Sequence, residues 1–330
     1  MKALLKIFSI FLMFLAICSC KGKDESANYP SGNLDFVAPA GVNSGYDLTA
    51  RTVAKVLSDT KIVKVPINVR NVTGKGGAVH LEAMQNIKGD TKTITVFSPP
   101  IIFINLNGTT QYSFRNLTPL ANLIADYGAF VVRADSGYET INDVMEALKR
   151  NPKSVKIGGF SAEGSMDHIQ FLIVARAAGV NNLNRIDYIS FDDNAANKLL
   201  EENIDLFSTS LADTMGLVER GDLKILAQTA DRRIGTGLKG QIPTCKEQGV
   251  DVTFINWRGL FGAPDMPEYA FNYWTNVLAQ MRNTQEWIET CAKYDWEEYY
   301  LNSYDFVRFL ERTETEYKAI MQDINMLKQN

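Results

Sequence analysis

The feature that most constrains the fold is a unit that occurs three times: a strand pattern, a loop with glycines, and an amphipathic helix pattern. Residues 34–57, 63–87 and 155–177 all follow this order. In the first unit Asp47 stands directly before the helical run, where we expect it to cap the helix. A helix that begins at such a loop presents unpaired N–H groups and the positive end of its dipole. Both features favour an anion at that point.

Strand and helix patterns alternate almost throughout, which predicts an α/β class with largely parallel sheets and helices on both faces. At 330 residues the chain is long enough for two domains. The strand patterns 120–124 and 129–133 are separated by a break at 126–128, where we expect a crossing between domains. A return crossing is expected at 252–257. Ligands bind at the carboxyl ends of strands in such sheets, so the three glycine loops are expected to share one cleft.

The first 20 residues are expected to direct export. Two early lysines precede a largely apolar run, 7–17, which is too short to span a bilayer as a helix. Cys20 follows a small residue in a segment that resembles the lipobox of bacterial lipoproteins, which implies lipidation of Cys20 and a membrane anchor. A plain secretory signal is the alternative. Residues 21–28 are polar and are interpreted as a flexible tether.

Charge and motif spacing exclude several functional classes. The net charge of −4 is spread over mixed acids and bases, so we expect no nucleic-acid partner. The glycines of 74–77 lack the Gly-Lys-Ser/Thr spacing of a phosphate loop. With two histidines and no metal-ligand spacing, we expect neither a metal nor a cofactor. Cys245 and Cys291 are expected as small buried side chains, with a disulfide as the alternative.

Ser165 and His168 lie three residues apart and raise the alternative of a secreted hydrolase. A serine triad requires a base oriented across the fold and an oxyanion hole, which neighbours on one helical turn do not supply. We therefore expect Ser165 to cap a helix and His168 to brace the preceding loop. The chain is not expected to be an enzyme.

The ordered motifs identify a family. From Tyr29 to Lys328 the chain resembles the substrate-binding proteins of tripartite tricarboxylate transporters, the Bug-type extracytoplasmic solute receptors. The three loop motifs and the closing segments of that family are matched by Gly45, Asp47, Ala50 and Arg51; by Asn71, Gly74, Gly76 and Gly77; by Gly164, Ser165 and His168; and by Ile242, Glu247, Gly249 and residues 257–264.

The resemblance implies a two-domain periplasmic binding protein of type II, a "Venus flytrap" with two hinge crossings. Domain 1 is expected to comprise residues 29–127 and 256–330, and domain 2 residues 128–255. Trp257 is expected to pack at the hinge, although a place on the cleft wall is also considered. A small carboxylate would be held by loop amides and ordered waters, and domain closure would signal to a membrane permease.

We expect ligand contacts from the glycine loops and from residues that follow strands: Asn43, Ser44, Gly45, Asp47, Thr73, Gly74, Lys75, Gly76, Gly77, Ser98, Ser161, Gly164, Ser165, His168, Asp192, Ser208 and Thr209. Asp192 and Asp193 stand where Lys-Gly is common in the family. Our hypothesis is that Asp192 pairs with Lys75 or binds an ammonium group of the ligand. Two solvated acids at a helix start are the alternative. A ligand sensor that works without a transporter is a further alternative for the whole chain.

Overall fold

The structure is a computed structural model that describes residues 25–191, 199, 201, 204–211, 215–294 and 296–328. The predicted signal, the predicted lipidation site Cys20, residues 21–24 of the predicted tether and the acids Asp192 and Asp193 lie outside the described residues. Within these ranges no helix has both the length and the apolar character needed to cross a bilayer.

Ten strands form one curled sheet, in the order β2-β1-β3-β9-β4-β7-β5-β6, with β8 and β10 also paired to β4. Pairing is parallel among β1 to β3 and among β5 to β7, but β4 and β9 are antiparallel to their neighbours. The strands are β1 Leu34–Ala38, β2 Ile67–Asn71, β3 Thr93–Phe97, β4 Thr118–Arg133, β5 Ile157–Gly159, β6 Tyr188–Ser190, β7 Leu206–Ser210, β8 Leu223–Gln228, β9 Ile255–Gly262 and β10 Glu297–Asn302.

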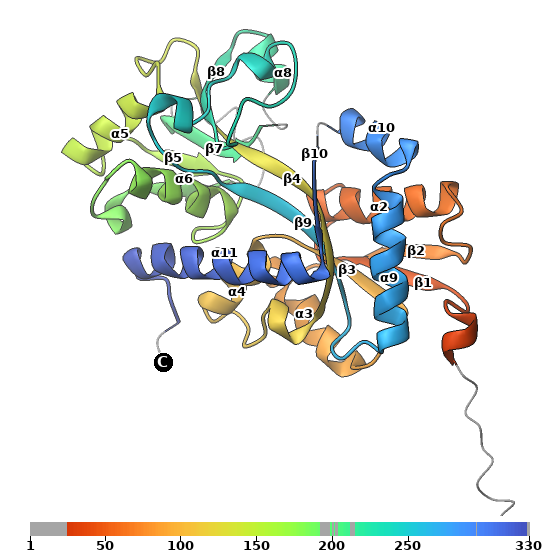
Figure 1. The fold of residues 1–330 in the computed structure, drawn as a ribbon. Coiled ribbons are helices and arrows are strands. Elements are labelled where there is room, and N and C mark those ends of the chain that lie inside the picture. Colours follow the sequence, from red (N-terminus) through yellow and green to blue (C-terminus); the bar gives the residue numbers. More distant parts are fainter. Residues whose placement is uncertain are drawn as a thin grey trace, which may run out of the picture.

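Helices cover both faces of the sheet (Figure 1). On one face α2 and α9 bury a core with Phe36 and Leu260. On the other face α3, α4 and α11 bury a core with Phe97 and Phe261. Burial of these cores is the main stabilising contribution to the fold. The helices are α2 Gly45–Asp59, α3 Ala78–Met84, α4 Pro100–Leu106, α5 Ile141–Arg150, α6 Met166–Ala177, α8 Met215–Glu219, α9 Glu268–Met281, α10 Gln285–Lys293 and α11 Ser303–Asp323.

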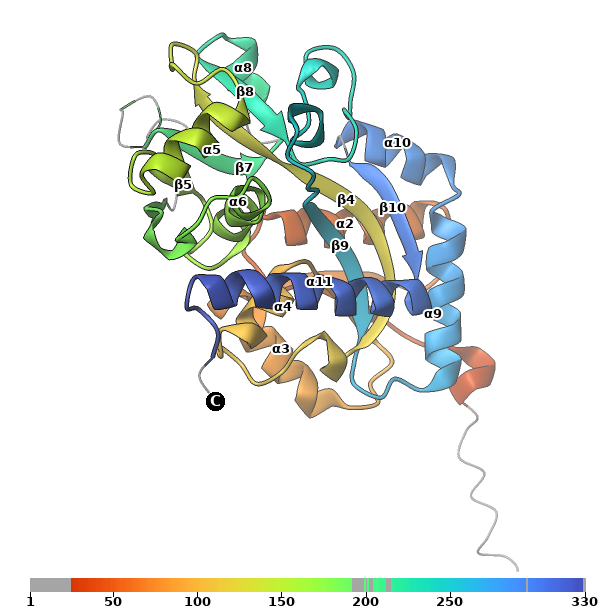
Figure 2. The same ribbon diagram turned by 60° about the vertical axis from the view of Figure 1, so that its left-hand side comes forward.

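Two lobes are joined by β4 and β9, which lie side by side across the middle of the molecule (Figures 1 and 2). Residues 118–127 of β4 pair with β9, whereas residues 128–133 pair with β7 and β8. The predicted α/β class with strand crossings is confirmed. The expected break at 126–128 is wrong, because β4 continues through it as one strand. At this point β4 changes its pairing partner but is not interrupted.

Trp257 is the third residue of β9 and is fully buried. Its ring makes an edge contact with Phe306 of α11, with centroids 5.5 Å apart. Trp257 thus packs where the strands cross, as expected, and does not line the cavity described below. Helix α4 was not predicted from the sequence, because two prolines stand at its start and prolines are also typical of the end of a strand.

Candidate functional site

A cavity of about 710 Å³ lies between the lobes. Its walls come from the start of α2, the end of β3, the middle of β4, the loop before α6, the end of β7 and the start of β9. Six predicted ligand residues line it, namely Asn43, Ser44, Gly45, Ser98, Ser161 and Thr209. The first and third glycine loops therefore face the same cavity.

The first loop is held by Asp47. Helix α2 begins at Gly45 and is capped by Ser44, whose hydroxyl accepts a hydrogen bond from Asp47 N, so the predicted cap at Asp47 is wrong. Instead, the carboxylate of Asp47 accepts hydrogen bonds from Asn43 N, Arg51 Nε and Asn71 Nδ2, each 2.9 Å long. Burial raises the pKa of Asp47, but these donors outweigh it and bring the pKa below its usual value.

The third loop is built around Asp167, in the first turn of α6. Its carboxylate accepts hydrogen bonds from Phe160 N and Ser161 N, both 2.9 Å, while Asp167 N donates to Ser161 Oγ. His168 Nδ1 accepts from Gly164 N at 3.0 Å, which confirms the predicted role of His168 as a brace of this loop. Both side chains fix the loop that bears Ser161 toward the cavity.

His168 is poorly suited to the base role of the hydrolase alternative. Its ring stacks on Tyr188, and burial lowers the pKa of His168 to about 4. Nδ1 is already occupied by Gly164 N. Ser165 stands at the predicted N-cap position of α6, but its side chain makes no cap hydrogen bond. Neither Ser165 nor His168 lines the cavity.

The wall from the second lobe is completed by Gln170. Its Nε2 donates to Ser208 Oγ at 3.0 Å and to Thr209 O at 3.1 Å, and Ser208 Oγ donates to the carbonyl of Asp167. Ser208 is buried behind the wall and only Thr209 of this predicted pair lines the cavity. Gln170 was not predicted, because its position in an otherwise apolar helix gives no signal of which side it faces.

The second glycine loop does not line the cavity. Gly74, Lys75, Gly76 and Gly77 all have positive φ, and Gly77 lies so close to Phe97 that an added Cβ would come within 3.2 Å of its ring. Thr73 does not line the cavity either. The following strand end does reach the cavity through Ser98, whose hydroxyl donates to Tyr46 Oη at 2.9 Å.

The sequence prediction missed the aromatic and charged residues of the cavity and one amide: Tyr46, Asp126, Tyr127, Phe160, Asp167, Arg258, Tyr294 and Trp296, with Asn256. Arg258 belongs to a segment that the family resemblance had already singled out. Its place next to Trp257 was the available signal, since in a strand a buried tryptophan puts its neighbour on the other face.

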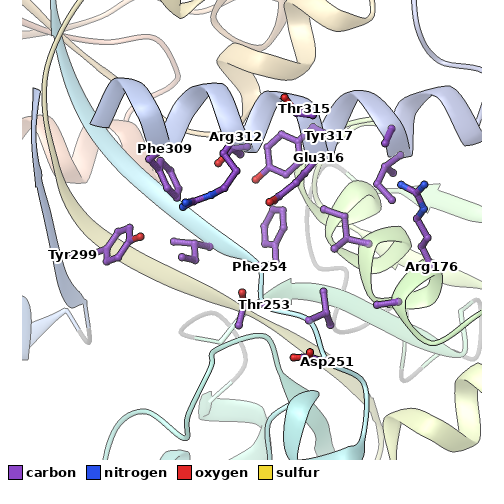
Figure 3. Close-up of a pocket in the computed structure, with 17 residues that line it drawn as sticks. Arg176, Asp251, Thr253, Phe254, Tyr299, Phe309, Arg312, Thr315, Glu316 and Tyr317 are labelled. Atoms are coloured by element: carbon purple, nitrogen blue, oxygen red, sulfur yellow. The ribbon is translucent and has the colours of Figure 1, made fainter. Parts of the chain in front are cut away.

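A second cavity, of about 900 Å³, lies on the opposite face of β9 (Figure 3). Ile255 lines it and Trp257 packs on α11 beside it, whereas Asn256 and Arg258 face the first cavity. In Figure 3, Arg312 and other α11 side chains face this space. Its walls come from α6, α11, residues 251–255 and Tyr299 of β10, and no glycine loop is among them, so it lacks the helix-start donors of the first cavity. We therefore take the first cavity as the candidate site.

Two lobes joined by two strands, with a cavity between the lobes, define the class of periplasmic solute-binding proteins. The chain matches the family described as "Tripartite tricarboxylate transporter family receptor" over residues 49–326, and it belongs to this family. The predicted family and the predicted two-domain fold are thus confirmed.

Individual relatives agree with this assignment. The chain is 24% identical over 322 residues to the UPF0065 protein in gbd 5'region of Cupriavidus necator, which covers 95% of this chain and 94% of the relative. A TctC solute binding protein from Polaromonas is 24% identical, with a TM-score of 0.73 over 89% of this chain and 99% of its own. Rpa4515 of R. palustris, solved with adipate, is 18% identical, with a TM-score of 0.74 over 90% and 99%.

Proposed function

We propose that the protein is an extracytoplasmic receptor that binds a small carboxylate-containing ligand between its lobes and delivers it to a membrane permease. The observation that carries this proposal is the convergence of the first and third glycine loops on one cavity at the start of α2. Backbone donors at a helix start favour an anion. A structurally similar protein that was solved with adipate supports a carboxylate as the ligand.

The hinge in this proposal lies at the change of strand partners in β4. Residues 29–127 and 256–330 form domain 1, and residues 128–255 form domain 2. The transfer of β4 from β9 to β7 between Tyr127 and Gly128 supports the first boundary. Rotation about β4 and β9 would bring Ser161 and Thr209 toward Ser44 and close the cavity on its ligand.

The direct contacts proposed are Asn43, Ser44, Gly45, Ser98, Ser161 and Thr209, which line the cavity. Asp47, Gly164, Ser165, His168 and Ser208 act behind them as supports of the loops and walls. The second loop, 73–77, would contact the ligand only after the two domains have closed. Asp192 lies outside the described residues, and its pairing with Lys75 stays a hypothesis.

A thermal-shift screen tests the ligand class. Adipate, malate, citrate and glutamate are each added to the exported chain, because a ligand that binds only the folded state raises its melting temperature. At 100 times its dissociation constant, a ligand stabilises by about 2.7 kcal/mol, which is an easily measured shift. The absence of a shift with every carboxylate would refute the proposed class.

Export and anchoring are proposed from residues 1–28. Cys20 is the proposed lipidation site, with residues 1–20 as the signal and 21–28 as the tether. Metabolic labelling with an alkyne fatty acid should mark the parent chain and not the Cys20→Ser variant. This variant should also be absent from the membrane fraction. Equal labelling of both chains would remove the anchor from the proposal. Delivery to a permease is tested separately, by loss of ligand uptake in cells that lack the receptor gene.

A further inference from the structure

We propose that Arg258 is a direct, charged anchor for the ligand carboxylate, so that recognition does not rest on loop amides and water alone. This inference rests on the proposed function, because it concerns the same cavity. Arg258 would then be the residue that makes the protein select a charged ligand over a neutral ligand of the same shape.

The guanidinium is held in place from one side only. Arg258 Nη1 donates to Asn256 Oδ1, and more weakly to the carbonyl of Trp257 at 3.5 Å. Nε and Nη2 donate to no residue that the structure describes, and Arg258 forms no ion pair with any of them. Since Arg258 is half-buried, these donors face the cavity with their binding capacity unused.

Gly45 leaves room for the guanidinium at the start of α2. A Cβ built on Gly45 would stand 2.6 Å from Nη2 of Arg258, which is closer than real contacts allow. The φ of Gly45 is not in the left-handed region, so the absent side chain matters for space and not for backbone conformation. The ring of Tyr46 lies on the same side, 5.9 Å from the guanidinium carbon.

The charges around this point favour an anion. Among the described residues that line the cavity, Arg258 is the one cation, and it stands beside the positive end of the helix dipole of α2. The positive charge of the guanidinium and the positive end of the helix dipole repel each other, and a negative group between them relieves this repulsion. A carboxylate with two oxygens matches the unused edge of the guanidinium that carries Nε and Nη2.

Neither acid that lines the cavity, Asp126 or Asp167, forms an ion pair with Arg258 in the part of the chain that the structure describes. Asp126 accepts a hydrogen bond from Tyr127 N at 2.8 Å, and Asp167 accepts from two amides of its own loop. Asp167 belongs to the other lobe, where Gln170 and Thr209 offer neutral polar groups. One carboxylate therefore binds at Arg258, and the remainder of the ligand faces neutral donors and acceptors.

The test measures affinity by calorimetry for whichever of adipate, malate, citrate and glutamate gives the largest thermal shift, together with the corresponding full amide. We expect Arg258→Gln to weaken carboxylate binding roughly 100-fold, because two charge-assisted hydrogen bonds are lost. Arg258→Lys keeps the positive charge but not the planar pair of donors, and its carboxylate affinity should fall about 10-fold. The parent should prefer the carboxylate to its amide strongly, and Arg258→Gln should not.

Gly45→Ala provides a second variant that keeps every charge. The atom displaced by the new methyl group is the flexible end of Arg258, so the unliganded melting temperature should stay near that of the parent. Carboxylate affinity should nevertheless fall about 10-fold, because the guanidinium moves away from the helix start. Because Gly45 itself lines the cavity, a smaller preference for the carboxylate over its amide in this variant decides the question if Arg258→Gln fails to fold.

Arg312→Gln is the matched control, since Arg312 lines the second cavity. It should bind as the parent does. Parent-like affinity in Arg258→Gln and Gly45→Ala would overturn the inference and leave the receptor proposal intact. A parent that binds no carboxylate of the set overturns both. Weakened binding in Arg312→Gln alone would place the ligand in the second cavity and would also overturn the inference.

Discussion

Asp47 supports the first loop, and its removal should destabilise the protein measurably. Its side chain is 3% exposed, whereas that of its ion-pair partner Arg51 is 48% exposed. The exposed pair therefore contributes only about 0.5 kcal/mol. The hydrogen bonds from Asn43 N and Asn71 Nδ2 are partly buried and end on a charged acceptor, so each is worth about 1.5 kcal/mol.

Asp47→Ala should thus lower the free energy of unfolding by about 3 kcal/mol. Urea denaturation followed by tryptophan fluorescence measures this loss, and the slope with urea should stay unchanged. Asp59→Ala is the matched control on the same helix, because Asp59 forms only an exposed pair with Lys55 and should cost under about 0.5 kcal/mol.

A loss below about 1 kcal/mol in Asp47→Ala would refute this account of the loop. The pH dependence gives an independent check. Because the folded pKa of Asp47 lies below its unfolded value, its contribution is present above the unfolded pKa and is lost as the pH falls through the folded pKa. Asp47→Ala should therefore lose less stability than the parent on acidification below about pH 4.

Two further predictions concern the hinge and the buried histidines. Gly128→Ala would place a Cβ 2.1 Å from Gln170 Oε1 at the change of strand partners. We therefore expect the free energy of unfolding in urea to fall by about 1–3 kcal/mol and ligand binding, measured by calorimetry, to weaken. Parent-like values in both measurements would contradict this steric clash. Burial lowers the pKa of His80 and of His168 to about 4, from about 6.5 in the unfolded chain. The unfolded state binds more protons between these values, so unfolding free energy should decline as the pH falls from 6.5 toward 4, and His168→Gln should flatten that decline.

Local sequence signals were sufficient where one element determines the outcome. The alternation of strand and helix patterns predicts the α/β class, and the loop motifs place Ser44 and Ser161 in loops between a strand and a helix. His168 was expected to brace its loop, and the contact with Gly164 lies within one turn of helix. Cys245 and Cys291 are free and buried, in agreement with the expectation of small apolar side chains.

Local sequence signals gave wrong predictions where two short-range patterns fitted the same residues equally well. Both Ser44 and Asp47 are able to cap α2, and only the hydrogen bonds from Asn43 and Asn71 assign Asp47 to the loop. The segment 126–128 has the composition of a turn, but pairing with β9 and β7 on either side keeps β4 extended. Tertiary hydrogen bonds outweigh local propensity at both points.

The sequence by itself therefore determined the class, the family and the loops with helix starts that could bind an anion. Only the tertiary structure decided which of these loops meet. It brought the first and third loops to one cavity, left the second loop outside it, and placed Arg258 beside Gly45. The physical reason is that a side chain's face is set locally by strand or helix periodicity, whereas its neighbours come from distant strands that pair across the sheet.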